Sequence, residues 1–146
     1  MLSTIEKVLF LKSVDLFSQI PAEELAEVAR IAREVSFEEG EVIIRKGDIG
    51  DKLYLIIDGE VKVMVNGREV ACLKEKECFG EMSILDAEPR SATVVAKSDV
   101  VLLEMGQEDF YQLLLERPEI AQAVIKVLTR RLREANRLIS ELKGKD

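Results

Sequence analysis

The sequence predicts a mainly β fold with flanking helices: an antiparallel β-roll or jelly-roll barrel with N-terminal helices and a long C-terminal helix. Three observations predict it. Short β-rich runs separated by turn residues occupy residues 37–106, and the regions before and after them both carry apolar residues at the three- and four-residue spacing of helices. Many short strands at about ten-residue spacing favour a barrel or jelly roll over a parallel sheet.

The bulk properties point to one soluble unit. We expect residues 1–146 to form a single domain of helices (1–36), β-roll (37–106) and helices (107–146). The balance of 47% hydrophobic and 34% charged residues suits a globular chain. No apolar run could cross a bilayer, and the first ten residues do not resemble a signal peptide. We therefore expect a cytoplasmic protein whose Cys72 and Cys78 are reduced thiols.

The composition also excludes several kinds of chemistry. The chain has no histidine, which rules out His-based triads, HExxH zinc sites and histidine-ligated haem. Two cysteines alone cannot close a zinc or iron–sulfur site, so we expect no metal, no cofactor and no catalytic residues. The net charge of −7 argues against direct nucleic-acid binding. It also means that an anionic ligand needs a local positive site.

The N-terminal region predicts two helices. Pro21 suits the first turn of the main helix, where a missing N–H costs little. Apolar residues then recur at helical spacing: Leu25, Val28, Ala29, Ala32 and Val35. An earlier apolar group predicts a short helix and an apolar turn: Val8, Leu9, Leu11, Leu16 and Phe17.

Six runs in the middle region predict strands: 42–44, 53–57, 61–65, 69–73, 92–96 and 100–104. Turn residues separate these runs, and Asn66-Gly67 between two alternating runs is a strong signal for a two-residue hairpin. Residues 47–51 resemble an acidic metal loop but offer too few ligands, so we interpret this segment as a turn.

Residues 107–142 are helical again, and Pro118 starts a long final helix. Its apolar residues step by four and three alternately over three heptads, which is the a/d pattern of a coiled coil. We call this set the seam: Ala121, Ile125, Leu128, Leu132, Ala135, Ile139 and Leu142. Two interpretations stay open. The seam pairs with a second chain to form a homodimer, or it packs on its own barrel.

The stretch 79–94 interrupts the strand pattern with residues suited to binding an anion. Gly80 permits close backbone approach, and residues 81–85 can form one helical turn whose free N–H groups attract an anion. Arg90 follows a proline and supplies a forked, permanently charged donor. Glu81 would be out of place beside an anion unless it accepts hydrogen bonds from ligand hydroxyls, and a ribose 2′-OH fits that role.

This stretch, Phe-Gly-Glu-Met-Ser-Ile-Leu-Asp-Ala-Glu-Pro-Arg-Ser-Ala-Thr-Val, resembles the phosphate-binding cassette of cyclic-nucleotide-binding domains. The most specific part of this match is Gly80-Glu81 together with Arg-Ser-Ala, which begins nine positions after the glutamate. The resemblance covers essentially the whole chain through shorter matches: Leu16-Phe17, Phe37-x-x-Gly40-Glu41, Gly47-Asp48-x-Gly50-Asp51, Leu53-Tyr54-x-Ile56, Gly59-x-Val61-x-Val63 and Arg130-Arg131-Leu132.

The resemblance implies a role for each site residue. Glu81 takes the ribose 2′-OH, and Arg90 takes the equatorial phosphate oxygen. The phosphate cradle is completed by backbone groups of five residues: Gly80, Met82, Ser83, Ser91 and Ala92. The purine contacts are Val63, Val70, Ala71 and Leu132. Asn136, one helical turn further on, is a candidate base contact, including one made across a dimer.

The resemblance implies a regulatory sensor for a cyclic purine nucleotide that shifts its C-terminal helix when the ligand binds. The apolar purine contacts favour cAMP over cGMP, although Ser91 is a residue that many cGMP-preferring relatives share. The alternative is a degenerate domain of the same fold that mediates protein contacts without nucleotide. A cupin-type enzyme is disfavoured because the chain has no histidine. The DNA-reading module of catabolite-activator relatives is not expected within these residues, and an output domain would lie outside this chain.

Overall fold

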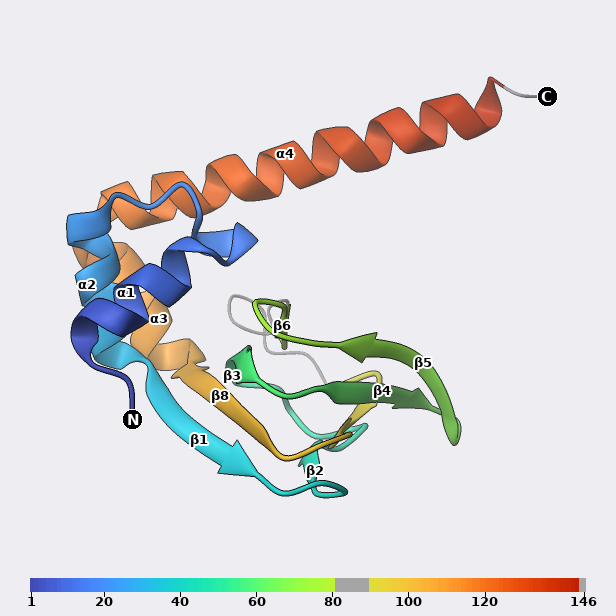
Figure 1. Ribbon diagram of the computed structural model, residues 1–146. Helices are drawn as coiled ribbons and strands as arrows, with labels where there is room; N and C mark the ends of the chain where they lie inside the picture. The colour runs from blue at the N-terminus through green and yellow to red at the C-terminus, as the bar shows by residue number, and fades with distance from the viewer. Residues whose placement is uncertain (81–89, 145–146) are drawn as a thin grey trace.

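The computed structural model describes residues 1–80 and 90–144, and Figure 1 shows a roll of strands with helices gathered at one end. Helix α1 (Thr4–Lys12) begins with a capping box at Ser3. The Ser3 hydroxyl accepts from the Glu6 N–H at 3.2 Å, and the Glu6 carboxylate accepts from the Ser3 N–H at 3.0 Å. The 3-10 helix η1 (Asp15–Phe17) and helix α2 (Ala22–Ile31) follow, which confirms both predicted helices.

The predicted end of the N-terminal helical region is wrong. Helix α2 ends at Ile31, Ala32 has an extended backbone, and strand β1 (Arg33–Phe37) occupies the residues that we expected to be helical. Val35, which continued the helical spacing, lies in this strand opposite Leu102. A β-branched residue suits a pleated strand as well as a helix, so pairing along the length of β1 with a distant strand decides the conformation.

The eight strands in the described part of the chain form two antiparallel four-stranded sheets. The first sheet has the order β1, β8 (Val100–Gly106), β3 (Lys52–Asp58) and β6 (Cys78–Phe79). The second has the order β2 (Val42–Ile44), β7 (Thr93–Ala96), β4 (Val61–Val65) and β5 (Arg68–Leu73). The six predicted strands and the β-roll class are confirmed, whereas β1 and β6 were not predicted.

The hairpin between β4 and β5 forms as its turn residues predict. Asn66 and Gly67 both have positive φ angles, of 52° and 77°. Such a pair is the backbone of a type I′ turn, whose twist matches that of the flanking strands.

Alternation along β3 divides the core into two layers. Leu53 and Leu55 are fully buried among the helices, in a cluster that includes Phe17, Phe110 and other apolar residues of α1, α2 and α4. Tyr54 and Ile56 point to the opposite face and join the cluster between the two sheets. Because successive side chains of a strand face opposite sides, one strand serves both layers and connects the helices to the interior of the roll.

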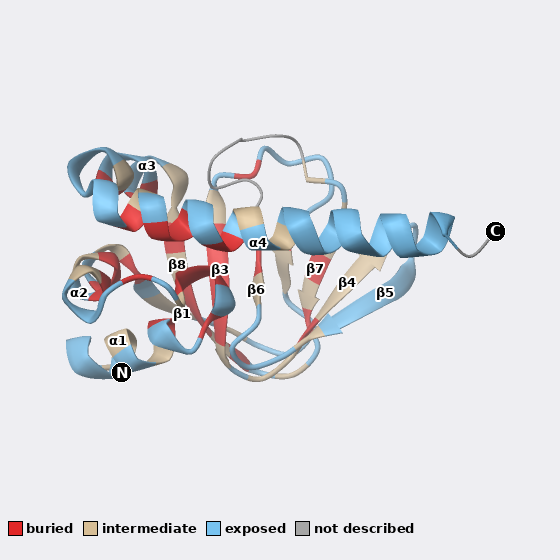
Figure 2. Cartoon of the chain, turned by 90° about the horizontal axis from the view of Figure 1, so that it is seen from above, coloured by how far each residue is buried: buried red, intermediate tan, exposed pale blue. Residues whose placement is uncertain are grey.

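Helix α3 (Gln107–Glu116) leads into α4 (Pro118–Lys143), and Pro118 stands in the first turn as predicted. Helix α4 would be about 39 Å long at 1.5 Å per residue. Its buried residues all lie in its first ten positions: Ile120, Ala123, Val124 and Val127. Figure 2 shows most of the rest of the helix as exposed, with residues of intermediate burial just beyond the buried turns.

The seam is a different face of α4 from the buried one. Ile125, Leu132, Ile139 and Leu142 are 61%, 62%, 51% and 68% exposed. In this structure the seam is therefore not packed on the chain's own barrel, because the buried contacts of α4 are made by another face. Packing of the seam on the barrel over a bound ligand stays a prediction. Pairing with a second chain stays a prediction.

Two further expectations concern a membrane-spanning segment and the state of the two cysteines. Within the described residues, no helix combines the length and the apolarity that crossing a bilayer requires. Cys72 on β5 and Cys78 on β6 are thiols rather than a disulfide.

Candidate functional site

Arg90 is the residue around which the candidate site is built. Its backbone N–H donates to the Asp48 carbonyl at 2.7 Å, and its own carbonyl accepts from the Gly47 N–H at 2.8 Å. The segment 47–51, interpreted from sequence only as a turn, therefore holds the backbone of Arg90 at both of its polar groups. No local pattern in the sequence points to this pairing, because the two segments are far apart in the chain.

The Arg90 side chain is fixed as well. One guanidinium nitrogen, Nη2, donates to the Lys52 carbonyl at 2.7 Å, at the first residue of β3. Within residues 1–80 and 90–144, no carboxylate forms an ion pair with this half-buried guanidinium. A partly buried cation that lacks an anionic partner is a natural place for an anion, because charges removed from water are usually paired.

Gly80 lies directly against this guanidinium. Its φ angle is +79°, and a Cβ placed on it would lie 2.5 Å from the Lys52 carbonyl oxygen and 2.9 Å from Arg90 Nη1. No side chain fits there, and the positive φ also favours glycine. The close approach predicted at Gly80 is therefore present, and it is made by Arg90 and Lys52 of the same chain.

Opposing effects act on the pKa of Arg90. Burial lowers the pKa of the guanidinium, while Tyr54 and Asp51 act in the opposite direction. An arginine remains charged throughout the neutral range. The site thus offers a persistent positive charge in a chain whose net charge is −7.

The other predicted cassette residues are placed only in part. Glu81, Met82 and Ser83 lie outside the described residues. Ser91 is exposed and Ala92 is partly buried, and both lie between Arg90 and the start of β7.

The predicted purine contacts on the strands lie together beside β7. Val63 on β4 pairs with Val94 of β7 on one side and with Ala71 of β5 on the other. The β4–β5 register shifts just after this pair, which leaves Val70 as an extra residue in β5. Val70 is 59% exposed and Ala71 is exposed, so this part of the second sheet presents apolar surface to solvent.

The predicted contacts on α4 are not brought to that surface. Leu132 and Asn136 are exposed, and α4 packs on α3 and η1 rather than on the second sheet. In Figure 1 the second half of α4 extends past the end of the helical layer. A base contact by these residues requires a different position of α4 or the α4 of another chain.

An ion-pair cluster that the sequence analysis missed holds α4 where it leaves the core. Asp15 of η1 pairs with Arg130 at 2.5 Å and with Arg131 at 3.1 Å. We call these contacts the Asp15 clasp. The partners are more than a hundred residues apart, and only the packing of α4 on η1 brings them together.

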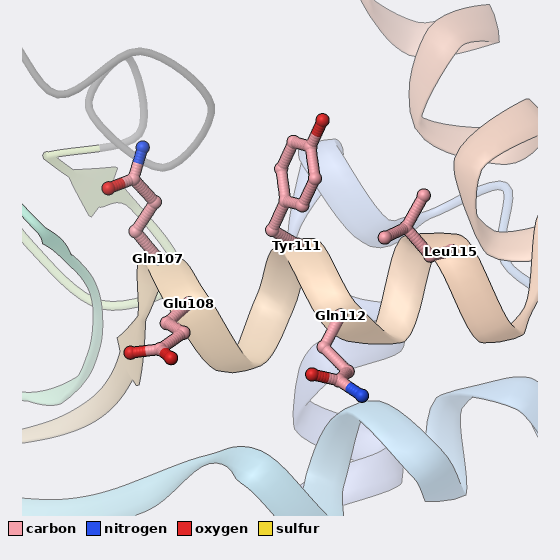
Figure 3. A pocket seen from close by; sticks show the side chains of 5 residues that line it. All are labelled: Gln107, Glu108, Tyr111, Gln112 and Leu115. Carbon is pink, nitrogen blue, oxygen red and sulfur yellow. The ribbon is translucent and has the colours of Figure 1, made fainter.

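A surface hollow lies on α3, and Figure 3 shows the side chains that line it. It is lined by five side chains of this one helix: Gln107, Glu108, Tyr111, Gln112 and Leu115. Among the described residues that line it, the hollow has a carboxylate and no cationic side chain, so these residues do not suit an anionic ligand.

Comparison with known proteins places the chain in a family. Residues 34–117 match the family model described as "Cyclic nucleotide-binding domain". A crystal structure of the N-terminal domain of a transcriptional regulator from Streptomyces coelicolor A3(2) is 36% identical, with a TM-score of 0.81 over 87% of this chain and 94% of that one. The chain belongs to the cyclic nucleotide-binding domain family, which is defined by binding rather than by catalysis.

Two curated relatives show the range of the family. A "CRP-like cAMP-activated global transcriptional regulator" of Mycobacterium tuberculosis is 30% identical over 132 residues, or 87% of this chain and 59% of that protein. A "cGMP-dependent protein kinase" of Toxoplasma gondii is 35% identical over 99 residues, which are 68% of this chain and 10% of that protein. This chain therefore spans only part of each of these relatives, and their names cover both purines.

Proposed function

We propose that this chain binds a cyclic purine monophosphate and that Arg90 holds the phosphate. The observation that carries the proposal is the half-buried Arg90 guanidinium, which is fixed to the Lys52 carbonyl beside Gly80 and has no carboxylate partner among the described residues. An arginine can present a fork of N–H donors to a phosphate. The resemblance adds the ribose role of Glu81 and the backbone roles of the neighbouring cassette residues: Gly80, Met82, Ser83, Ser91 and Ala92.

The base would lie on the apolar surface of the second sheet. Val63, Val70 and Ala71 are the residues of this surface, and β7 connects it to Arg90. Leu132 and Asn136 would join the site when α4 covers the base, or when a second chain supplies its own α4.

We propose that cAMP is preferred over cGMP. The Ser91 hydroxyl could accept from the guanine 2-amino group, at a net gain of about 1 kcal/mol. The apolar contacts at Val63, Val70, Ala71 and Leu132 offer no side-chain partner for the guanine carbonyl. Once α4 covers the base, each buried polar group without a partner would cost about 1–3 kcal/mol.

Ligand binding would shift the population between two positions of α4. The helix is anchored at its start by Val124 and Val127 and at its exit by the Asp15 clasp, whereas its second half is exposed. A ligand that contacts Leu132 favours a position in which α4 lies over the second sheet. The shift is limited by the difference in ligand affinity between the two positions.

The exposed seam supports a second proposal, that two chains pair through α4 as a homodimer. The seam repeats over three heptads on the face that the core leaves uncovered. Apolar residues at this spacing pack as knobs into holes between helices. A cytoplasmic location and control of an output domain complete the proposed role.

Calorimetric titration with cAMP and cGMP tests the proposal, after removal of any nucleotide retained from the expression host. We expect one site per chain, with an affinity near micromolar or about −8 kcal/mol. Competition of both nucleotides against one fluorescent ligand, for wild type and Ser91→Ala, measures the preference. A cGMP preference that disappears in Ser91→Ala would contradict the choice of cAMP. Absence of heat and of thermal stabilisation at millimolar ligand would favour the alternative, a protein-interaction module without nucleotide.

A further inference from the structure

The side chain of Thr93, the first residue of β7, joins two segments where the pairing of β2 with β7 ends. The last pair of the two strands is Ile44 with Val94. Beyond it, the backbone N–H of Lys46 donates to the Thr93 hydroxyl at 3.1 Å. A side-chain oxygen thus satisfies a backbone donor that the strand ladder no longer pairs. The resemblance implies no role for Thr93, although it lies within the stretch 79–94.

The two residues that follow in the chain hold the backbone of Arg90. The Gly47 N–H donates to the Arg90 carbonyl at 2.8 Å, and the Arg90 N–H donates to the Asp48 carbonyl at 2.7 Å. With the contact to Thr93, hydrogen bonds join three consecutive residues to Arg90 and Thr93. We call residues 46–48 the Arg90 brace.

Thr93 points away from the proposed base surface. Successive side chains of a strand face opposite sides, and the next residue, Val94, is 5% exposed and belongs to the cluster between the two sheets. Val94 also pairs directly with Val63, one of the predicted purine contacts. An effect of Thr93 on the ligand would therefore pass through the Arg90 brace and Arg90 rather than through contact with the base.

We propose that Thr93 is a positioning residue whose hydroxyl holds the Arg90 brace and thereby fixes the backbone of Arg90. This inference rests on the proposed function. The guanidinium is held separately by the Lys52 carbonyl at 2.7 Å, so the chain between β2 and the start of β3 holds Arg90 at both its backbone and its side chain. Hydrogen bonds weaken steeply when their angles depart far from linear. A displaced Arg90 backbone would therefore misalign the fork with the phosphate.

Thr93→Val tests this role because it removes the hydroxyl and keeps a branched side chain that suits a strand. Lys46 is exposed, so water can accept from its N–H and the variant should fold. We expect cAMP affinity to fall about twofold to tenfold, the range of one lost hydrogen bond. Thr93→Ser, which keeps the hydroxyl, should restore the affinity of wild type.

Ser98→Ala is the matched control, because it removes the same kind of contact just beyond the other end of β7. The Ser98 hydroxyl accepts from the Glu60 N–H at 3.1 Å. Its loss should lower the unfolding free energy about as much as Thr93→Val does, while cAMP affinity stays that of wild type. A fall in affinity at Thr93 alone separates positioning of Arg90 from general destabilisation, and an equal fall in Ser98→Ala would overturn the inference.

A double-mutant cycle tests whether Thr93 acts through Arg90. In an Arg90→Ala background, Thr93→Val should change cAMP affinity less than about twofold, since the effects of residues that act through one another are not additive. Three results would overturn the role of Thr93 and leave the proposed function intact: an equal loss in both backgrounds, no loss in the wild-type background, or a loss that Thr93→Ser does not restore.

If Thr93→Val does not fold, Thr93→Ala and Thr93→Ser decide, because these two variants differ only by the hydroxyl. Weaker cAMP binding by Thr93→Ala than by Thr93→Ser is expected, and equal binding overturns the inference. A wild-type protein that binds neither nucleotide overturns the proposed function as well.

Discussion

Arg90 donates a hydrogen bond of 2.7 Å to the backbone carbonyl of Lys52, 38 positions away in the chain. A backbone carbonyl at the start of a strand cannot change rotamer, so the guanidinium is fixed by the sheet itself. The same carbonyl would lie 2.5 Å from a Cβ on Gly80. Lys52, Gly80 and Arg90 are therefore packed against one another, with the Arg90 guanidinium held at the first residue of β3.

Arg90→Ala should weaken binding of cAMP more than tenfold. Hydrogen bonds to charged groups contribute about 1.5–3 kcal/mol, and the variant removes the proposed counter-ion of the phosphate. Arg90→Lys should also bind more weakly, since a point charge cannot reproduce the fork. The control is Arg30→Ala, whose arginine is exposed and pairs with Glu27 on the same helix. Calorimetry that gives wild-type affinity for Arg90→Ala would refute the phosphate role.

Gly80→Ala should destabilise the fold and weaken binding together. The added Cβ meets a backbone carbonyl, which cannot move as a flexible side chain can, and the positive φ adds strain of about 1–3 kcal/mol. Gly67→Ala is a matched control, because Gly67 has a similar φ of +77° but nothing within 4 Å of its Cβ position. We expect a larger loss of unfolding free energy at Gly80, and a loss of affinity at Gly80 only. Equal losses of unfolding free energy for Gly80→Ala and Gly67→Ala in urea denaturation would show that the close packing at Gly80 does not contribute to stability.

Asp15→Asn should tighten nucleotide binding by a small factor. The Asp15 clasp holds α4 in its present position, and breaking exposed ion pairs costs about 0–1 kcal/mol each. A ligand that binds with α4 in another position then breaks fewer ion pairs when the helix moves. Glu134→Gln is the control, because Glu134 pairs with Arg137 within α4 and does not connect it to η1. Weaker binding by Asp15→Asn, with an unchanged Glu134→Gln, would mean that the clasped position is the one that favours the ligand.

Analytical ultracentrifugation should find a dimer, and Ile139→Asp should shift it to monomer. Ile139 is 51% exposed and lies on the seam beyond the proposed base contacts. A charge there would be buried in the interface without a partner. Leu115→Asp, at an equally apolar and 71% exposed position on α3, should leave the dimer intact. A wild-type monomer at high concentration would exclude pairing through α4.

The stability of the wild-type fold should fall with rising pH between about 10 and 12 in part because of Tyr54. Its pKa is raised from 10 to about 12 in the folded chain. In that interval the unfolded chain has released the Tyr54 proton and the folded chain still holds it, so unfolding becomes easier as the pH rises. Tyr54→Phe lacks this contribution, and its unfolding free energy should decline less steeply over the same interval. Parallel declines in urea denaturation would show that Tyr54 is not held neutral by its surroundings.

The features that local chemistry decides were predictable from the sequence. The β4–β5 hairpin follows from Asn66 and Gly67, whose positive φ angles suit a two-residue turn. The first turn of α4 follows from Pro118, and six strands follow from short β-rich runs between turn residues. Gly80 and Arg90 could be singled out because their spacing matches a family motif, and the structure brings the two together.

The features that depend on distant partners were decided only by the tertiary structure. The helical spacing of the N-terminal region runs to Val35, and pairing with β8 makes residues 33–37 a strand. The links from Arg90 to Lys52 and from Asp15 to α4 join residues that no local pattern relates. The same holds for the seam, since its heptad repeat cannot tell which face of α4 the core covers. A periodic pattern specifies which side chains share a face, whereas the packing of the whole chain determines what that face meets.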